Sequence, residues 1–413
     1  MSLLRRARRG HLPPLGPDFT RLWSASAITN LGDGALLAAG PLLVASLSPS
    51  AVAVSAAVVV QQLPKLLFAL FAGALVDRLP RRAVLVAANL ARAAVLGVLA
   101  LTVLTGEVHL GLFYGALFLM GVGESLADTA YGAVLVHVVG RESLGRANAR
   151  LALTFSLNNQ LLGPPVGALA FAVLWALPFA FDALAFALAG LLIARITQVR
   201  TPAPEPEETG QARLWAQITR GLAFVWRTPG LRTLCGCILV MNLTGVGAFA
   251  IWVLYAREHL GLSETGFGLF IAAGAVGGIV GSRVYGWLEP RTGRGWILRV
   301  GLLVEAATYA ALALTTDGAV AGVVMGLFGV HTVVWGIAAT TVRQRVTPDH
   351  LLGRVGSVYM VADLGGAALG ALAGGFLAEY VGLLVPFWIA ACAVGLLSVV
   401  AWPPLGRIEQ TAS

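Results

Sequence analysis

The sequence predicts an all-α integral membrane protein with twelve transmembrane helices, arranged as two parallel six-helix repeats. The chain has a mean hydropathy of +0.82 and only 12% charged residues, whereas soluble domains carry about 25%. Apolar stretches of about 20 residues, enough to cross a bilayer, recur from Phe19 to Pro403 with short polar breaks. Landmarks of the first half also return in the second. Because lipid offers the backbone no hydrogen-bonding partner, stretches of this length are expected to be helical.

The apolar stretches place the individual helices. We expect them at residues 20–45, 52–76, 83–104, 110–138, 150–173, 177–195, 233–256, 266–288, 296–315, 319–342, 355–380 and 384–402. The basic start of the chain and the small residues of "LLAAGPLL" resemble a signal peptide. However, the first apolar run contains Asp33, is longer than a signal peptide and has a counterpart in the second half. We therefore assign it to the first helix.

Arginines predict the orientation of the helices, because Lys and Arg concentrate in cytoplasmic loops. The loops after the second, fourth, sixth, eighth and tenth helices hold Arg78, Arg81, Arg82, Arg141, Arg146, Arg200, Arg213, Arg291, Arg294, Arg343 and Arg345. Only Arg257 is clearly placed on the other side. We therefore expect a multi-pass protein of the bacterial inner membrane with both termini in the cytoplasm. The net charge of +8 reflects this topology and attraction to membrane lipids, and we expect no nucleic-acid binding.

Repeated landmarks divide the chain into two halves. "ITNLGDG" in the first helix matches "LVMNLTG" in the seventh, and "LGR" at 144–146 returns at 352–354. Each copy begins in the cytoplasm and has six helices, which makes the repeats parallel. The expected divisions are an N-terminal half at 1–195, a linker at 196–232 and a C-terminal half at 233–413.

The linker is predicted to contain an amphipathic helix. It begins with the Pro- and Glu-rich segment "TPAPEPEETG" and continues into a stretch with apolar residues on one helical face. The residues of this face are Leu214, Ile218, Leu222 and Val225. Such a helix suits the inner membrane interface. An ordinary solvated linker helix is the alternative.

The segment "GALVDRLPRR", between the second and third helices, matches the pattern G-x-L-x-D-R-x-x-R-R, and a weaker copy, "GWLEPRTGR", follows the eighth helix. With twelve helices in two halves, this motif resembles the major facilitator superfamily over essentially the whole chain. The segments "LGDG", "GRANAR", "GPPVGA" and "RTPGLRTL" resemble its drug:proton antiporter branch, which includes macrolide-efflux and enterobactin-exporter proteins. The resemblance implies the major facilitator fold. It also implies a proton-coupled secondary transporter, not an enzyme, that exports an amphipathic drug, macrolide or siderophore-like molecule by alternating access.

Two other functions remain open on the same fold: translocation of lysophospholipids or other lipids, and proton-driven uptake by symport. The sequence has no Walker loop, no H-E-x-x-H motif and no cysteine pair at metal-binding spacing. We therefore expect no cofactor, and a proton gradient as the source of energy. "GPPVGA" has Ala168 where the antiporter motif that it resembles has a glycine, which leaves ordinary small-residue helix packing as an alternative. We expect a monomer.

The same loop motif predicts a gating latch. Gly73 would allow a tight cytoplasmic turn, and Asp77 would precede the third helix, whose N-terminus favours a negative charge. Arg81 and Arg82 can bind carboxylates, carbonyl groups or lipid phosphates. In the family this loop holds the two halves together in the outward-facing state. By that resemblance, Asp77 would engage the start of the eleventh helix near Arg354. Simple anchoring of the arginines in the cytoplasm is the alternative.

Ionisable residues inside the predicted helices must pair or line water, because a charge at the bilayer centre costs about 2.5–3.5 kcal/mol. In the family, the first, fourth, seventh and tenth helices line the central cavity, and by that resemblance Asp33, Glu124 and Asp128 are candidates for proton coupling. The helical rise places Asp33, Lys65 and Asp128 at one depth, about 18–20 Å from the cytoplasmic side. Lys65 is the only lysine and, unlike an arginine, can release its proton. Glu124 and Asp128 share a helical face, so one of them should hold a proton. We expect an Asp33–Lys65 ion pair that breaks when an acid is protonated; a static salt bridge is the alternative.

Polar and aromatic residues predict a substrate cavity. His331 and Trp335 lie four residues apart at mid-depth of the tenth helix, and Asn242 and Trp252 lie in the seventh. Asn30 matches Asn242 in the repeat. An apolar and aromatic surface with few polar groups is typical of small-molecule sites. Packing of the histidine and tryptophan between helices is the alternative.

Four further ionisable residues receive less weight. Arg92 and Asp182 fall in the third and sixth helices, which are peripheral in the family, so we expect structural roles for them. Glu305 and Asp363 receive no specific role.

Overall fold

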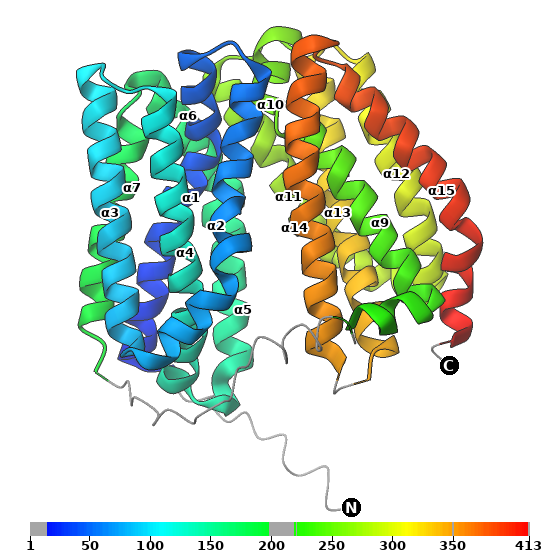
Figure 1. Ribbon diagram of the computed structural model, residues 1–413, viewed down its shortest axis with the longest axis horizontal. Coiled ribbons are helices and arrows are strands. Elements are labelled where there is room, and N and C mark those ends of the chain that lie inside the picture. The colour runs from blue at the N-terminus through cyan, green and yellow to red at the C-terminus, as the bar shows by residue number, and fades with distance from the viewer. Residues whose placement is uncertain (1–14, 198–218, 220, 349–350, 412–413) are drawn as a thin grey trace, which may run out of the picture.

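The computed structural model describes residues 15–197, 219, 221–348 and 351–411, without the side chains of residues 66, 68–78, 141 and 408–411. Every regular element in this part of the chain is helical, and the helices form two bundles that stand side by side (Figure 1).

The N-terminal bundle contains α1 (Pro17–Leu47), α2 (Ala51–Arg78), α3 (Arg81–Thr105), α4 (Leu110–Val139), α5 (Leu144–Thr154), α6 (Gly163–Val173) and α7 (Leu177–Ala194). The 3₁₀ turn η1 (Arg141–Ser143) precedes α5, and the π-helical η2 (Phe155–Leu162) joins α5 to α6. The C-terminal bundle contains α9 (Pro229–Phe249), α10 (Trp252–Leu254), η3 (Tyr255–His259), α11 (Glu264–Thr292), α12 (Arg294–Leu314), α13 (Gly318–Val346), α14 (Leu352–Tyr380) and α15 (Val385–Thr411).

Local sequence signals start several of these helices. Proline stands in the first turn of α1, α6, α7 and α9, where its missing N–H is not needed. Ser263 caps α11 by accepting a hydrogen bond from the Gly266 backbone N–H. Asp317 caps α13 through the backbone N–H groups of Ala319 and Val320. The starts of these helices are therefore encoded locally.

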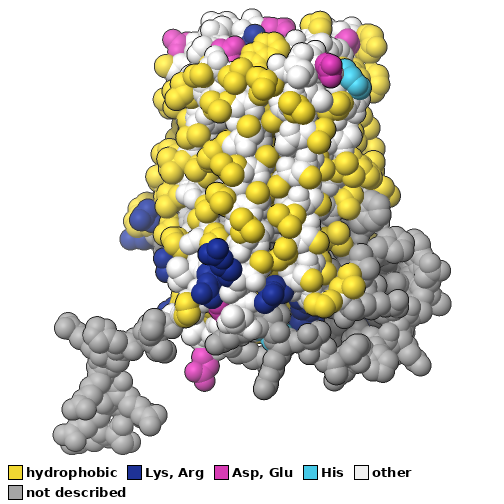
Figure 2. Space-filling view, turned by 90° about the vertical axis from the view of Figure 1, so that its left-hand side faces the viewer, with side chains coloured by type: hydrophobic (Ala, Val, Ile, Leu, Met, Phe, Trp, Pro, Cys, Tyr) yellow, Lys and Arg dark blue, Asp and Glu magenta, His cyan; other side chains and the backbone are white. Residues whose placement is uncertain are grey.

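Ten helices in the described part of the chain are long and apolar enough to cross a membrane: α1, α3, α4, α7, α9, α11, α12, α13, α14 and α15. Each coincides with a predicted span. The predicted spans 52–76 and 150–173 fall on α2 and on the continuous run from α5 through η2 to α6. Figure 2 shows hydrophobic side chains over much of the visible face, with arginines gathered toward its lower end. This surface suits a helical bundle in lipid.

The end of α2 differs from the prediction. We expected Gly73 to form a tight turn, but α2 continues through it, and the chain leaves the helix only at residues 79–80. Asp77 likewise belongs to the last turn of α2, and its side chain lies outside the described residues. The apolar run ahead of the motif extends the helix past both positions. In the second half, Gly293 has a φ of +77° and does separate α11 from α12.

Within each bundle, some helices cross at glycines. A Cβ on Gly167 or Gly163 would overlap the backbone of α1, which Gly163 meets at Gly34. In the C-terminal bundle, a Cβ on Gly374 of α14 would overlap Gly247 of α9 in the same way. Because glycine has no side chain, it allows the backbones of membrane helices to approach closely. These crossings fix α6 against α1 and α14 against α9.

The π-helical η2 sits beside the first of these crossings. The Asn158 Nδ2 donates a hydrogen bond to the Ala27 carbonyl of α1 at 2.9 Å. A Cβ on Gly34 would contact the backbone of Asn159, which shows how closely η2 lies against α1. A π-helical stretch inside an α-helix often marks a functional region. These contacts hold η2, the middle of the continuous helix from α5 to α6, against α1.

The two bundles contact each other near the end opposite the one where α1 starts and α15 ends (Figure 1). Glu379, near the end of α14, accepts hydrogen bonds from Ser50 Oγ at 2.9 Å and from the Val52 backbone N–H at 3.3 Å. Next to it, Gly375 lies against Ser55 of α2, and α11 packs on α6. Toward the other end, the N-terminal bundle has a buried apolar cluster of its own. The ribbons diverge in that direction.

The predicted linker helix is described only at residues 219 and 221–227, which are helical. Leu214 and Ile218 lie outside the described residues. Val225 is buried, whereas Leu222, on the same predicted apolar face, is 49% exposed. Gly221 lies against the Arg354 backbone of α14. The described turn therefore packs on the C-terminal bundle.

Candidate functional site

A cavity of about 830 Å³, called the first cavity below, lies among α1 to α4, η2 and α7 and is bounded on one side by α9, α10 and α11. Its aromatic lining comprises Phe113, Tyr131, Phe155, Phe179, Phe249, Trp252 and Phe267. Its charged lining comprises Asp33, Lys65, Arg92, Glu124 and Asp128. The apolar spans thus enclose a chamber that gathers five ionisable side chains. The four residues that we predicted for proton coupling are among them.

The ion pairs in this cavity are not the expected ones. Arg92 Nη2 lies 3.1 Å from Asp33 Oδ1, and Lys65 Nζ lies 3.0 Å from Glu124 Oε1. The expected Asp33–Lys65 pair is therefore wrong for this conformation. Depth along the helices placed Asp33, Lys65 and Asp128 in one layer, and all three line this cavity. Arg92 reaches the same layer from α3, which the sequence assigned to the periphery.

Asp128 differs from the other acids of the first cavity. Asp128 lies one helical turn beyond Glu124 and is exposed. It forms no ion pair among the described residues. The charged lining therefore contains three acids and two bases. The acid left over can accept a proton or a positively charged group that enters the cavity.

Asn30 and Trp252, which we predicted to bind substrate, both line the first cavity. The Asn30 side-chain amide donates to the Ser26 carbonyl at 2.7 Å. The Trp252 ring packs edge-on against Phe249 with centroids 4.1 Å apart, and its buried Nε1–H has no hydrogen-bond partner. Trp252 is therefore separated from the histidine and tryptophan with which we grouped it. It closes the side of the first cavity that faces the C-terminal bundle.

The other three predicted substrate residues, Asn242, His331 and Trp335, line a second cavity of about 610 Å³ within the C-terminal bundle. Phe249 lines both cavities and so stands between them. The indole N–H of Trp335 donates to the Leu298 carbonyl at 3.3 Å. The second cavity thus repeats the arrangement of the first, with polar groups on aromatic walls.

Two acids to which the sequence gave no role shape the second cavity. Glu305 Oε2 lies 3.2 Å from His331 Nε2, and both side chains are buried. Asp363 Oδ1 accepts a hydrogen bond from Asn242 Nδ2 at 2.9 Å. An acid within an apolar helix is costly unless it is paired. We selected Asp33 because it is an acid inside an apolar helix. The same criterion applied to Glu305 would have predicted that it has a partner, but would not have identified His331.

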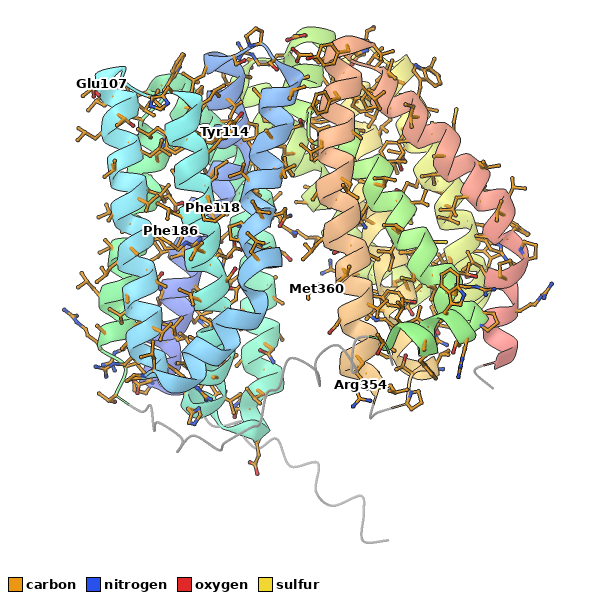
Figure 3. All side chains as sticks on the ribbon, viewed as in Figure 1. Glu107, Tyr114, Phe118, Phe186, Arg354 and Met360 are labelled. Atoms are coloured by element: carbon orange, nitrogen blue, oxygen red, sulfur yellow. The ribbon has the colours of Figure 1, made fainter. Side chains whose placement is uncertain are left out.

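Arg92 and Asp182 also differ from expectation, because Arg92 lines the first cavity and Asp182 is buried beside Gly32, the neighbour of Asp33 in α1. Arg92 lines the first cavity, and its guanidinium lies 3.8 Å from the centre of the Phe186 ring of α7. Figure 3 shows Phe186 at mid-height of the N-terminal bundle. Asp182, one turn before Phe186, is fully buried and packs against Gly32 of α1. Both ionisable groups therefore lie in the layer of Asp33.

The predicted latch is described only in part. Arg82 Nη1 donates to the Ile196 carbonyl at 2.6 Å, which ties the start of α3 to the end of α7. Arg81 is half-buried. Arg354 lies at the lower end of α14 (Figure 3). Since the Asp77 side chain is outside the described residues, the expected contact between Asp77 and Arg354 stays a prediction.

The two cavities can bind an organic molecule and take up protons. Aromatic walls offer apolar and stacking contacts, while paired acids and bases can exchange partners when one acid gains a proton. Among the described residues, no group of three or more His, Cys, Asp or Glu side chains could hold a metal ion.

Known proteins are similar to this chain over most of its length. A family model described as "Transmembrane secretion effector" matches residues 10–410. The multidrug efflux pump Tap of Mycolicibacterium fortuitum is 28% identical over 389 residues, which cover 91% of this chain and 93% of that pump. The enterobactin exporter EntS of Escherichia coli O1:K1 / APEC is 28% identical over 320 residues, covering 72% of this chain and 71% of EntS. A crystal structure of a bacterial homologue of the iron transporter ferroportin, in its inward-facing state, shares this fold. It matches with a TM-score of 0.75 at 18% identity, over 96% of this chain and 98% of that one.

Proposed function

This chain belongs to the transmembrane secretion effector family of the major facilitator superfamily and is a membrane transporter, and we propose that it exports an amphipathic small molecule in exchange for protons. The observation that carries the proposal is the first cavity. It places two ion pairs and an additional acid inside an aromatic chamber, within helices that are otherwise apolar. A charged group in such a place is costly, and its presence points to function.

Proton exchange would act through the two observed ion pairs. A proton that reaches Asp33 neutralises it and frees Arg92, and a proton on Glu124 frees Lys65 in the same way. Asp33 and Arg92 join α1 to α3, while Lys65 and Glu124 join α2 to α4. Protonation would therefore loosen two helix pairs around the cavity. Asp128 would offer a further carboxylate to a proton or to a cationic group of the substrate.

The proposal includes the twelve-helix arrangement in two repeats. It counts α2 and the run from α5 to α6 as spans, in addition to the ten apolar helices. The crossings of Gly34 with Gly163 and of Gly247 with Gly374 support the repeat, since they join corresponding helices in each half. The halves are then residues 1–195 and 233–413, with the linker 196–232 between them.

Alternating access would follow from the contacts between the bundles. We propose that both termini are cytoplasmic, in a bacterial inner membrane, because the arginine-rich loops lie at the same end of the helices as the termini. The contact between Glu379 and Ser50 then closes the outer side, and the conformation is inward-facing. The likeness to an inward-facing ferroportin homologue supports this assignment. In the outward-facing state, the latch of Asp77 and Arg354 would close the cytoplasmic side.

The relatives suggest the class of substrate. Tap is a multidrug efflux pump and EntS exports enterobactin. We propose a drug-like or siderophore-like molecule that occupies the first cavity, where Asn30 and Trp252 lie, and extends past Phe249 toward Asn242, His331 and Trp335.

Inverted membrane vesicles with an acidic interior test the proposal. A panel of macrolides, tetracyclines, siderophores and lysolipids is added while a pH-sensitive dye reports the gradient. We expect one compound to collapse the gradient partially, and expect no response in Asp33→Asn. The matched control is Glu107→Gln, which neutralises an exposed acid between α3 and α4 and should respond like the wild type. If folded wild-type protein responds to none of these compounds, export by proton exchange is refuted in favour of symport. Headgroup-dependent movement of a lysolipid alone would favour lipid translocation.

A further inference from the structure

Asp182 of α7 is a buried carboxyl group that takes part in neither ion pair of the first cavity. It has no exposed surface, and both of its carboxyl oxygens lack a hydrogen-bond partner. An ionised carboxylate in that situation loses its hydration without compensation, which is far more costly than burying the neutral acid. In this conformation Asp182 therefore carries a proton.

The surroundings of Asp182 contain one acid and one base. The helices packed on α7 are chiefly α1 and α3, and to a lesser extent α6, which has no ionisable side chain. Asp33 from α1 and Arg92 from α3 are the charged groups whose electrostatic influence reaches Asp182. Gly32 leaves room for the carboxyl, since a Cβ there would overlap it. Asp182 thus lies next to the Asp33–Arg92 pair.

Arg92 has a hydrogen bond to spare. One of its terminal nitrogens contacts Asp33, while its Nε–H is buried without a partner. Its guanidinium rests on the Phe186 ring, and Phe186 follows Asp182 by one turn on the same face of α7. The unpaired donor of Arg92 and the unpaired carboxyl of Asp182 therefore lie near the same ring of α7. Arg92 thus has the free donor that an ionised Asp182 would require.

We infer that Asp182 is a second proton-carrying group of the coupling site: Asp33 and Asp182 share one proton, and Arg92 binds whichever of the two is ionised. The inference deepens the proposed proton exchange and rests on it. In the transfer, the O–H bond of Asp182 breaks and an O–H bond forms on Asp33. The electron pair stays on Asp182, which becomes the carboxylate partner of Arg92. The arginine keeps its charge, and the net charge of the three groups does not change.

The two acids differ in their access to water, which gives them different tasks. The Asp33 side chain is 34% exposed in the first cavity, whereas Asp182 is sealed between helices. Asp33 can exchange its proton with the cavity, while Asp182 holds a proton out of reach of solvent. Two carboxyl groups close enough to interact favour a state in which only one is ionised. Asp182 therefore stores the proton while Asp33 is paired with Arg92.

Infrared spectroscopy of the purified full-length protein tests this inference without a substrate. A buried protonated carboxyl gives a C=O stretching band distinct from that of a carboxylate. We expect the wild type at neutral pH to show a component of this band that is missing from the spectrum of Asp182→Asn. We also expect its loss in Asp33→Asn, although Asp182 is intact there, because the freed Arg92 should pair with Asp182 and ionise it. Glu107→Gln is the matched control and should keep the band.

Transport gives the second readout. Asp182→Asn should lose proton-coupled movement of the substrate while keeping substrate-for-substrate exchange. A merely structural role would leave the Asp33→Asn spectrum with its band, and that result would overturn the inference even if Asp182→Asn failed to fold. If the wild type moved substrate without protons, the proposed function would fail. The infrared bands would still decide whether the two acids share a proton.

Discussion

The contact between His331 and Glu305 allows the structural role of a predicted substrate residue to be measured. We consider His331→Leu, which removes the partner of Glu305 and leaves a similar volume. The two side chains are 5% and 4% exposed, and the N–O distance is 3.2 Å. Gly301 of α12 lies against the His331 ring, so the histidine is held where it can reach the acid. The variant leaves a buried acid with fewer partners.

The expected loss of stability follows from these contacts. Breaking a buried pair by removing one partner costs about 3–5 kcal/mol. Glu305 keeps a hydrogen bond from the Tyr309 hydroxyl at 3.3 Å, which retains about 0.5–1.5 kcal/mol. We therefore expect His331→Leu to lower the free energy of unfolding by about 2–4 kcal/mol. The double variant His331→Leu/Glu305→Leu should recover most of this loss, because no uncompensated acid remains buried.

Denaturant unfolding of the purified protein in detergent measures both variants. Thr332→Val is the control, since Thr332 is the exposed neighbour of His331 on α13 and should change the free energy of unfolding by no more than about 0.5 kcal/mol. The reasoning is refuted if His331→Leu is as stable as the wild type. It is also refuted if the double variant is less stable than the single one.

Two further predictions concern the helix crossings and the contact between the bundles. Gly167→Leu should sharply reduce the yield of monodisperse protein in size-exclusion chromatography, because its Cβ would overlap the backbone of α1. Gly97→Leu, at a position with open space around it, should not, and equal yields would contradict the close crossing. Glu379→Ala should speed maleimide labelling of Ser55→Cys in a background without the native cysteines, because it removes two hydrogen bonds between the bundles. Glu107→Ala is the control for that labelling, and an unchanged rate in Glu379→Ala would show that the carboxylate does not hold the bundles together.

The sequence predicted the helices better than the contacts between them. Length and hydropathy are local properties, so all ten of the apolar helices that the structure identifies fall on predicted spans. The turn after α2 was predicted at Gly73, but the helix continues to Arg78, because an apolar run does not mark the residue at which a helix ends. The π-helical η2 was not predicted, since its wider turns depend on contacts with α1 such as that of Asn158 with Ala27.

The candidate site was predicted in composition but not in pairing. Counting residues along a helix gives depth, and the three residues placed at one depth, Asp33, Lys65 and Asp128, all line the first cavity. The partner of each charge depends also on the rotation of the helix about its axis and on its neighbours. Arg92 therefore takes the place expected of Lys65, and His331 finds Glu305 on another helix. These pairings depend on tertiary packing, which the spacing of residues along the sequence does not predict.

The glycine crossings also bear on how this protein can change by mutation. Every substitution of a glycine adds at least a Cβ, and at Gly34, Gly163, Gly247 and Gly374 there is no room for one. Cavity-lining positions are different, because a new side chain there can extend into open volume. Random point mutation should therefore abolish the protein mostly at its helix crossings and vary its selectivity mostly at its cavity walls. A saturation library sorted first for folded protein and then for the proposed export would separate these two groups of positions.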